Sequence, residues 1–122
     1  MDSIPLVAIS GQVNSELLGR DVFQEADVTG ACESFTKHSY LVKNAADLPR
    51  VFKEAFAIAS TGRPGPVLID VPVDVQQSMV EGEFSYPAVA DIVGYKPRTE
   101  GNGLQIKRAM AAIKEAKRPL IC

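Results

Sequence analysis

A stiff turn runs directly into a short apolar strand in residues 62–72, Gly62-Arg63-Pro64-Gly65-Pro66-Val67-Leu68-Ile69-Asp70-Val71-Pro72. The prolines and glycines of the first half restrict the backbone to a turn. The residues from Val67 to Val71 favour a strand, and prolines on both sides limit its length. Because Pro72 lacks the N–H that a strand ladder uses, the strand is expected to end there. We therefore predict a short central strand of a parallel sheet.

An amphipathic helix is predicted just before this turn. Asp47 is in place to cap it, and Pro49 falls in its first turn, where the missing N–H does least harm. Gly62 follows the last periodic residue and suits a left-handed C-terminal cap. The apolar side chains recur every three or four residues and form one stripe, which comprises Leu48, Val51, Phe52, Ala55, Phe56 and Ala59.

Two more strands are predicted nearer the N-terminus. The apolar residues 5–10 are typical of a buried parallel strand, and Ser10-Gly11-Gln12 is expected to turn at its carboxyl end. Residues 40–42 are predicted to form a second short strand, and one or two short helices are expected within residues 20–34, with Asp21 as N-cap. Strands joined through helices imply right-handed crossovers. The fold class is therefore α/β, with part of a doubly wound parallel sheet.

The second half of the chain has a different organisation. Residues 76–103 show no sustained periodicity and contain several glycine and proline turns, which is typical of an interdomain linker. A helix is expected from about residue 104 to 116, and a buried strand is expected to begin at Arg118. We interpret residues 104–122 as the truncated start of a second α/β domain, and the whole chain as a fragment.

Composition excludes several classes of protein. The 122 residues carry a net charge of -2, so no broad basic surface is expected and nucleic acid is not a predicted partner. No apolar run reaches the length of a membrane span and no signal-type segment opens the chain, so we expect a cytoplasmic protein without a membrane partner. The two cysteines, Cys32 and Cys122, lack the spacing of a zinc or redox motif.

Five stretches occur together in an order and spacing that match one enzyme family. They are Asp2-Ser3-Ile4-Pro5-Leu6-Val7, Ser10-Gly11-Gln12-Val13, Gly19-Arg20-Asp21-Val22-Phe23-Gln24-Glu25, Thr36-Lys37-His38-Ser39-Tyr40-Leu41-Val42 and the residues 62–72 quoted above. These motifs resemble the catalytic subunit of acetohydroxyacid (acetolactate) synthase, a thiamine diphosphate-dependent enzyme. The resemblance implies that residues 1–75 are the C-terminal part of the pyrimidine-binding domain and that residues 104–122 begin the central domain.

The resemblance also implies a reaction and its cofactors. Such enzymes decarboxylate pyruvate and join the two-carbon unit to a second 2-oxo acid, in branched-chain amino-acid biosynthesis. Thiamine diphosphate and Mg²⁺ are implied, bound mainly by domains outside this chain, and whether FAD is retained is left open. The cofactor lies between two subunits in this family, so a homodimer or homotetramer is implied, with a regulatory subunit as a further candidate partner.

The family's main catalytic groups do not match any residue of this chain. The glutamate that activates the cofactor lies upstream of Met1 in the family pattern, and the Gly-Asp-Gly motif that holds the metal lies downstream of Cys122. Glu25 therefore does not inherit the catalytic role. No catalytic residue and no metal ligand is assigned, and the isolated chain is expected to be inactive.

Two short segments are candidates for the active-site cavity. Phe23 and Gln24 match a phenylalanine and glutamine that line the cavity in the family, and a glutamine amide can donate and accept hydrogen bonds. Without the motif match, Phe23 would be read as core and Gln24 as helix surface. Gly11, Gln12 and Val13 follow the first strand, where Gly11 allows close approach of a ligand or forms a simple turn.

Several other polar residues have simpler interpretations. His38, the only histidine, precedes a strand and is interpreted as structural rather than as a proton carrier. Asp70 and Asp74 are expected to cap a turn or pair locally, because nothing completes a metal site around them. Val73 stands where many acetohydroxyacid synthases have a lysine, and Asn14-Ser15-Glu16 replaces a common proline or arginine contact. Both departures leave the acceptor substrate undetermined.

Three alternatives to the synthase hypothesis follow. In the first, the chain is part of another thiamine diphosphate-dependent decarboxylase or carboligase. In the second, it is a non-catalytic α/β module that binds a partner. A small Rossmann-type nucleotide-binding protein is the third, and the absence of a G-x-G-x-x-G motif argues against it.

Overall fold

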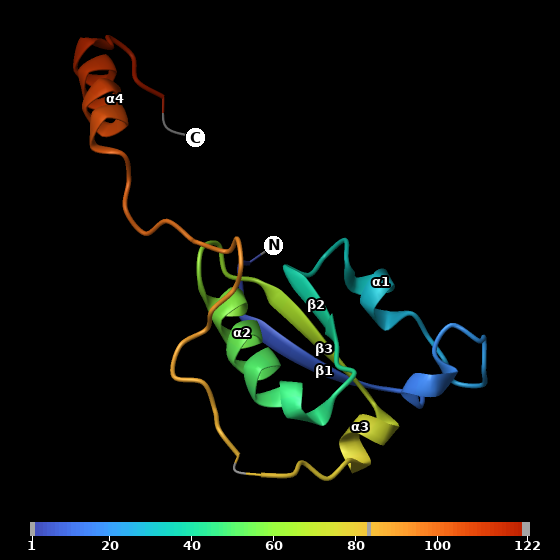
Figure 1. The fold of residues 1–122 in the computed structure, drawn as a ribbon. Coiled ribbons are helices and arrows are strands. Elements are labelled where there is room, and N and C mark those ends of the chain that lie inside the picture. Colours follow the sequence, from blue (N-terminus) through green and yellow to red (C-terminus); the bar gives the residue numbers. More distant parts are fainter. Residues whose placement is uncertain (1, 83, 121–122) are drawn as a thin grey trace.

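A three-stranded parallel sheet forms the centre of the molecule (Figure 1). The computed structural model describes residues 2–82 and 84–120. The strands are β1 (Leu6–Gln12), β2 (His38–Leu41) and β3 (Pro66–Pro72), in the order β1-β3-β2. The predicted central parallel strand is confirmed, since β3 pairs in parallel with β1 on one edge and with β2 on the other.

The core of the protein is built around β3. Val67 and Ile69 are fully buried, because apolar side chains on β3 are covered by neighbouring strands and by a helix. The remaining buried members of this cluster come from β3 itself, from the segment after β2, from the long helix α2 and from α3, and they are Val42, Ala45, Val51, Ala55, Ile58, Ala59, Val71 and Val75.

The two connections between the strands lie on opposite faces of the sheet. Helix α1 (Val28–Cys32) joins β1 to β2, and helix α2 (Leu48–Ser60) joins β2 back to β3. On the α2 face, the Tyr40 hydroxyl donates a hydrogen bond to Glu54 of α2 at 2.9 Å. On the other face, Gln12 bonds Ala26, which leads into α1. Right-handed crossovers running in opposite directions across one sheet give this doubly wound arrangement, so the predicted fold class is confirmed.

Helix α2 follows the predicted pattern except that Phe56 is 54% exposed and Ile58 is buried instead. Its first turn is also capped differently. Pro49 lies in the first turn as expected, and Gly62 has the left-handed φ of 62° that ends such helices. Asp47 makes no side-chain cap and instead pairs with Arg50 at 3.1 Å. A preceding 3-10 turn is capped by Asn44, whose side chain accepts from the Ala46 N–H at 3.0 Å. The prediction of an Asp47 cap was wrong because this turn precedes the helix.

Strand β1 differs from its prediction in length and in burial. The turn expected at Ser10-Gly11-Gln12 is absent, because these residues continue the strand and pair with residues 70–72 of β3. The strand is also not fully buried: Leu6 is 54% exposed and Ile9 is 61% exposed at the outer edge of the sheet. A strand paired on one edge only has no second neighbour to cover it, which is the physical reason for both exposures.

The segment between β1 and α1 contains less helix than expected. A 3-10 helix, η1, spans Ser15–Leu17, and α1 begins only at Val28. The expected N-cap Asp21 has a φ of 52° and caps nothing, whereas the Asp27 side chain accepts from the Gly30 N–H at 2.9 Å and caps α1. A short helix α3 (Val73–Gln77) directly follows β3 and was not predicted.

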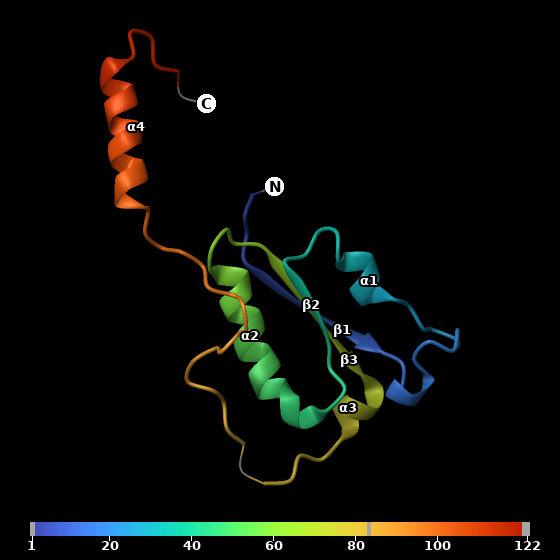
Figure 2. The same ribbon diagram turned by 45° about the horizontal axis from the view of Figure 1, so that its top comes forward.

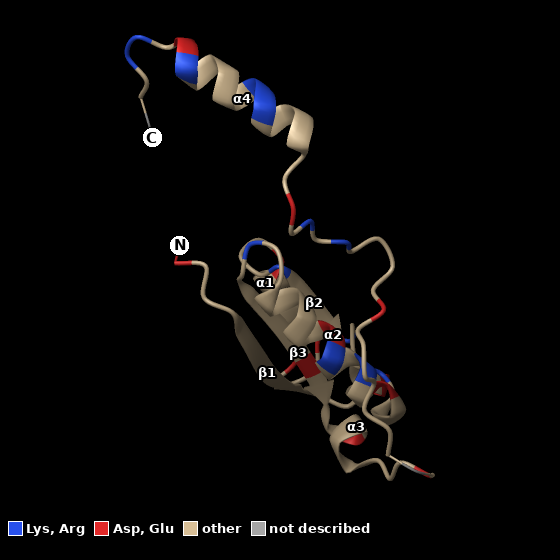
Figure 3. Cartoon of the chain, turned by 90° about the vertical axis from the view of Figure 1, so that its left-hand side faces the viewer, with Lys and Arg blue, Asp and Glu red and all other residues tan. Residues whose placement is uncertain are grey.

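The C-terminal part of the chain extends away from the sheet (Figure 2). Within the described residues, no helix or strand lies between Ser78 and Asn102, and helix α4 (Gly103–Glu115) follows. Positive side chains occur along α4 and along the segment before it (Figure 3). Residues 118–120 form no strand, because no other strand lies beside them, and residues 121–122 lie outside the described part. The division into domains stays a prediction.

The apolar stripe of α4 has no partner in the described structure. Leu104, Ile106, Met110 and Ile113 are all about half exposed, at 59%, 53%, 49% and 55%. Among residues 2–82 and 84–120, no helix combines the length and apolar character needed to cross a membrane.

A hydrogen-bonded cluster holds the segment after α3 against the end of α2. The Lys37 ammonium donates to the carbonyls of Ile58 and Thr61 and to the Tyr95 hydroxyl, which lies 3.2 Å away. The Tyr95 hydroxyl also donates to the Thr61 carbonyl at 3.1 Å. A cation at a helix C-terminus satisfies carbonyls that have no helical partner. This cluster therefore attaches Tyr95 and its neighbours to α2.

We expect Tyr95→Phe to release this attachment without disturbing the sheet. Loss of one or two hydrogen bonds should speed trypsin cleavage after Arg98 by about 2- to 10-fold. Tyr86→Phe is the control, because the Tyr86 hydroxyl makes no hydrogen bond to the described residues, while its ring stays over Lys53. Equal cleavage rates in the two variants would show that Tyr95 does not hold the segment.

Candidate functional site

A buried carboxylate organises the carboxyl edge of the sheet, where ligand sites of α/β proteins lie. Asp70 of β3 is only 1% exposed. Ser10 Oγ donates to Asp70 Oδ1 at 2.7 Å, and Gln12 Nε2 donates to Asp70 Oδ2 at 3.1 Å. A buried carboxylate without donors would be costly. The two side chains of β1 therefore stabilise Asp70, and Asp70 in turn fixes the end of β1.

Both the nitrogen and the oxygen of the Gln12 amide make hydrogen bonds within the chain. Its Nε2 also donates to the Ala26 carbonyl at 2.6 Å, and its Oε1 accepts from the Val13 N–H at 2.9 Å. These bonds tie the end of β1 to the segment that leads into α1. A Cβ added at Gly11 would lie 3.6 Å from Gln76 Nε2, an ordinary contact distance. The side-chain hydrogen bonds of residues 11–13 run to Asp70, Ala26 and within the segment itself, and a role for these residues in a ligand cavity stays a prediction.

Asp74 anchors the loop that follows β1. Its carboxylate accepts from the Ser15 N–H at 2.9 Å and from the Ser15 hydroxyl. The hydroxyl hydrogen bond is the main reason why the pKa of the Asp74 carboxyl is lowered from its ordinary value, with the backbone bond next. Asp70 and Asp74 were expected to cap a turn or pair locally, but both carboxylates accept hydrogen bonds from residues 58–60 positions earlier in the chain. No group of three or more histidine, cysteine or acidic side chains that could hold a metal occurs in the described residues.

Phe23 and Gln24 project from an exposed loop at residues 19–25. Phe23 is 89% exposed, and Gln24 has a left-handed φ of 66° that non-glycine residues rarely adopt. The loop is closed by Glu25, whose carboxylate accepts from the Gly19 N–H and from the Val22 N–H. Sequence reasoning set Glu25 aside and missed this structural role. Among the described residues, no hydrogen bond joins Phe23 or Gln24 to residues 11–13.

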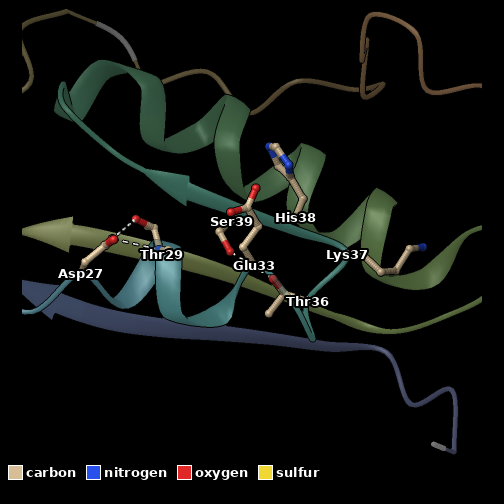
Figure 4. A pocket seen from close by; sticks show the side chains of 8 residues that line it. Asp27, Thr29, Glu33, Thr36, Lys37, His38 and Ser39 are labelled. Atoms are coloured by element: carbon tan, nitrogen blue, oxygen red, sulfur yellow. Dashed lines mark hydrogen bonds between the residues drawn. The ribbon is translucent and has the colours of Figure 1, made fainter.

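An open groove of about 480 Å³ lies between α1 and β2 (Figure 4). The sequence did not indicate it, because its walls come from separate segments. Within it, the hydroxyls of Thr36 and Ser39 lie 3.1 Å apart. The side chain of Lys37 points away toward α2, where its hydrogen bonds lie (Figure 4). The lining residues are Asp27, Thr29, Gly30, Glu33, Thr36, Lys37, His38 and Ser39.

His38 has a structural contact on the rim of this groove. Its ring meets the Tyr40 ring edge-on, with centroids 4.4 Å apart. Such an arrangement is favourable between aromatic rings. No hydrogen bond joins the His38 ring to an acid or a hydroxyl among the described residues.

Solved structures place this fold within a class of enzymes. The chain aligns with benzoylformate decarboxylase from Polynucleobacter necessarius at a TM-score of 0.77 and 25% identity, covering 97% of this chain and 21% of that one. It also aligns with a protein from Mycobacterium smegmatis that is described as a candidate thiamin diphosphate-dependent enzyme. The TM-score is 0.75 and the identity 25%, and the alignment covers 97% of this chain and 22% of that one. The fold is therefore one that occurs within thiamine diphosphate-dependent enzymes.

The similarity in sequence is more specific than the similarity in fold. The chain is 50% identical over 121 residues to the acetolactate synthase of Mycobacterium leprae, and 50% identical over 121 residues to the acetolactate synthase large subunit of Buchnera aphidicola subsp. Schizaphis graminum. Each alignment covers 99% of this chain, but only 19% of the Mycobacterium leprae protein and 21% of the Buchnera protein. This chain therefore spans about a fifth of the length of these relatives. No protein-family model matches the chain. The chain corresponds in sequence to a segment of acetolactate synthase large subunits, and the predicted resemblance is confirmed.

We expect Gln12→Ala to destabilise the fold measurably. The substitution removes one of the donors to the buried Asp70 and the bond to Ala26, which should lower the free energy of unfolding by about 1–3 kcal/mol. Urea denaturation measures the change. Gln77→Ala is the matched control, because Gln77 is exposed and its side chain makes no hydrogen bond to the described residues. A loss no larger than that of the control would refute the role of Gln12.

The Ser15–Asp74 pair should make stability depend on pH at the acid end. Because the folded pKa of Asp74 is lowered, its contribution is complete above the unfolded pKa, about 4, and is lost as the pH falls through the folded pKa. The stability advantage of the wild type over Asp74→Asn should therefore shrink steadily below about pH 4. Urea unfolding at several pH values tests this, with Asp91→Asn as control. A difference that stays constant with pH would contradict it.

Proposed function

We propose that this chain forms part of a thiamine diphosphate-dependent carboligase of the acetolactate synthase type. Such an enzyme decarboxylates pyruvate and joins the two-carbon unit to a second 2-oxo acid, in branched-chain amino-acid biosynthesis. The observation that carries the proposal is the 50% identity to acetolactate synthases over 99% of this chain. The fold match to a benzoylformate decarboxylase supports the same class of chemistry.

In this proposal the described residues supply a wall of the active-site cavity and not the metal site. They contain no cluster that could hold Mg²⁺, so Mg²⁺ and the diphosphate are assigned to other parts of a longer enzyme. Thiamine diphosphate, when bound, supplies the electron-accepting ring on which decarboxylation depends. The part that this chain can play is to orient reactants and exclude water. FAD remains a candidate cofactor on the family resemblance alone.

The wall is assigned to Phe23 and Gln24. The exposed amide of Gln24 can both donate and accept a hydrogen bond, which suits an aminopyrimidine ring or the carboxylate of a 2-oxo acid. The Phe23 ring beside it, 89% exposed in this chain, would exclude water once a partner domain covers it. An aromatic ring in water is unfavourable unless something packs on it, so its exposure supports a covered position in the working enzyme.

Assembly with other subunits and domains belongs to the same proposal. We infer a homodimer or homotetramer formed through the pyrimidine-binding domain, with a regulatory subunit as a further candidate partner. Apolar side chains are exposed on β1 and on the apolar stripe of α4, at 61% for Ile9 and 53% for Ile106. Burial of such surfaces is the usual driving force for association. Residues 104–122 are accordingly assigned to the start of the central domain.

The acceptor 2-oxo acid is expected to be set partly by Val73. This residue is 39% exposed at the start of α3, beside the carboxyl edge of the sheet. A valine there offers no positive charge, whereas the lysine common in the family does. We therefore propose a less polar cavity entrance than in lysine-containing synthases.

A chimeric enzyme tests the proposed function. This chain replaces the matching segment of the Mycobacterium leprae acetolactate synthase, and acetolactate formation from pyruvate is measured with thiamine diphosphate and Mg²⁺. We expect activity that depends on thiamine diphosphate. We also expect Phe23→Ala and Gln24→Ala each to lower kcat/KM by roughly 10- to 100-fold, because both misplace or expose the reactants.

The control and the contrary result are equally specific. Gln77→Ala should leave kcat/KM unchanged, because this exposed side chain lies outside the proposed wall. A chimera with the native oligomeric state and native thermal stability that forms no acetolactate would reject the proposal. It would favour the alternative of a non-catalytic α/β module or of a different carboligase.

A further inference from the structure

The loop that carries Phe23 and Gln24 has no apolar core of its own. No residue between Gly11 and Asp27 is fully buried, so packing cannot fix the path of this segment. Its shape must come from hydrogen bonds. Three polar ties are present: Ser15 to Asp74 near its start, Gln12 to Ala26 near its end, and Glu25 across the loop itself.

The conformation of this loop is one that the backbone does not adopt freely. Gly19, Asp21 and Gln24 all have positive φ, at 77°, 52° and 66°. For the two non-glycine residues such angles are unfavourable and persist only where surrounding interactions hold them. Three left-handed residues within six positions therefore require a local interaction that outweighs their cost.

Glu25 provides that interaction. One carboxylate oxygen accepts from the Gly19 N–H, and the other accepts from the Val22 N–H at 3.2 Å. The Glu25 N–H in turn donates to the Val22 carbonyl at 3.0 Å. The bond from the Gly19 amide lowers the pKa of Glu25 from its ordinary value, so the carboxylate is charged at neutral pH. Charged acceptors make stronger hydrogen bonds with backbone amides than neutral ones.

We propose that Glu25 is a positioning residue for the active site: by binding the amides of Gly19 and Val22, its carboxylate holds the 19–25 loop in the shape that presents Phe23 and Gln24. This inference rests on the proposed function, because it assigns a consequence for the 2-oxo acid to the geometry of that loop. Glu25 itself is not assigned a contact with substrate or cofactor. It acts through the backbone on either side of Phe23.

The test uses the chimeric enzyme described above and two readouts. Glu25→Ala removes both acceptors, and Glu25→Gln retains only one oxygen acceptor at nearly the same size. Hydrogen–deuterium exchange of peptides that cover residues 18–25 reports on the loop. The KM for pyruvate reports on presentation of the cavity wall. Glu100→Gln is the matched control, because Glu100 is exposed in the segment before α4.

We expect exchange in residues 18–25 to rise about 10-fold or more in Glu25→Ala and less in Glu25→Gln, since two charge-assisted hydrogen bonds are lost or weakened. The KM for pyruvate should rise in the same order. A merely destabilised enzyme would instead lose active fraction, and hence kcat, at constant KM. The control should change neither readout.

Three results would distinguish the role of Glu25 from the proposed function of the chain. Unchanged exchange in Glu25→Ala would overturn the inference directly. Faster exchange with KM and kcat/KM unchanged would also overturn it, because the loop would then play no part in the reaction. Faster exchange in Glu25→Ala combined with an inactive but correctly assembled parent chimera would reject the proposed function while supporting the role of Glu25 in holding the loop.

Discussion

Strand β3 is hydrogen-bonded along both edges, to β1 and to β2, and both of its faces are covered. Its apolar side chains Val67 and Ile69 form the centre of the core against α2. Asp70, which is also buried, points to the opposite face and fixes Ser10 and Gln12. The same strand therefore supplies both the hydrophobic stabilisation of the domain and the polar anchor for the segment that leads to the candidate site.

The segment that follows β1 is held in place by polar contacts rather than by apolar packing. Gln12 reaches Ala26, Asp74 holds Ser15, and Glu25 closes the loop between them. Loops positioned by a rigid sheet commonly carry binding residues, and here the rigid part ends at the carboxyl edge of β1 and β3. The exposed Phe23 ring is the apolar feature at the end of this chain of contacts. In the proposed enzyme it would meet its partner surface there.

Much of the fold was predictable because its signals are local. Strand β3 could be predicted from four β-favouring residues that, with Asp70, lie between prolines. Helix α2 could be predicted from apolar residues recurring every three or four positions, with Gly62 after its end. The full length of β1 was not predictable, since Ser10 and Gln12 stay in the strand through partners 58 or more positions away on β3. Helix α3 was missed because five residues after a proline carry too little periodicity.

The candidate site was predictable only in part, for a related reason. The family resemblance indicated Phe23, Gln24 and residues 11–13. It could not show that the Gln12 amide donates hydrogen bonds to Asp70 and Ala26. Glu25 carried a visible signal, an acidic residue shortly after a glycine, yet its role depends on three left-handed residues that no pattern reveals. The groove along α1 was hidden because residues 27–33 and 36–39 face each other only after the chain folds.

The most direct test of the account is a crystal structure of the chimeric synthase with thiamine diphosphate, Mg²⁺ and pyruvate or an unreactive analogue bound. We expect the Phe23 ring and the Gln24 amide to lie within about 4 Å of the cofactor or the 2-oxo acid, with Glu25 bound to the amides of Gly19 and Val22. A loop that faces solvent, away from the bound cofactor, in a fully assembled enzyme would contradict the proposed cavity wall.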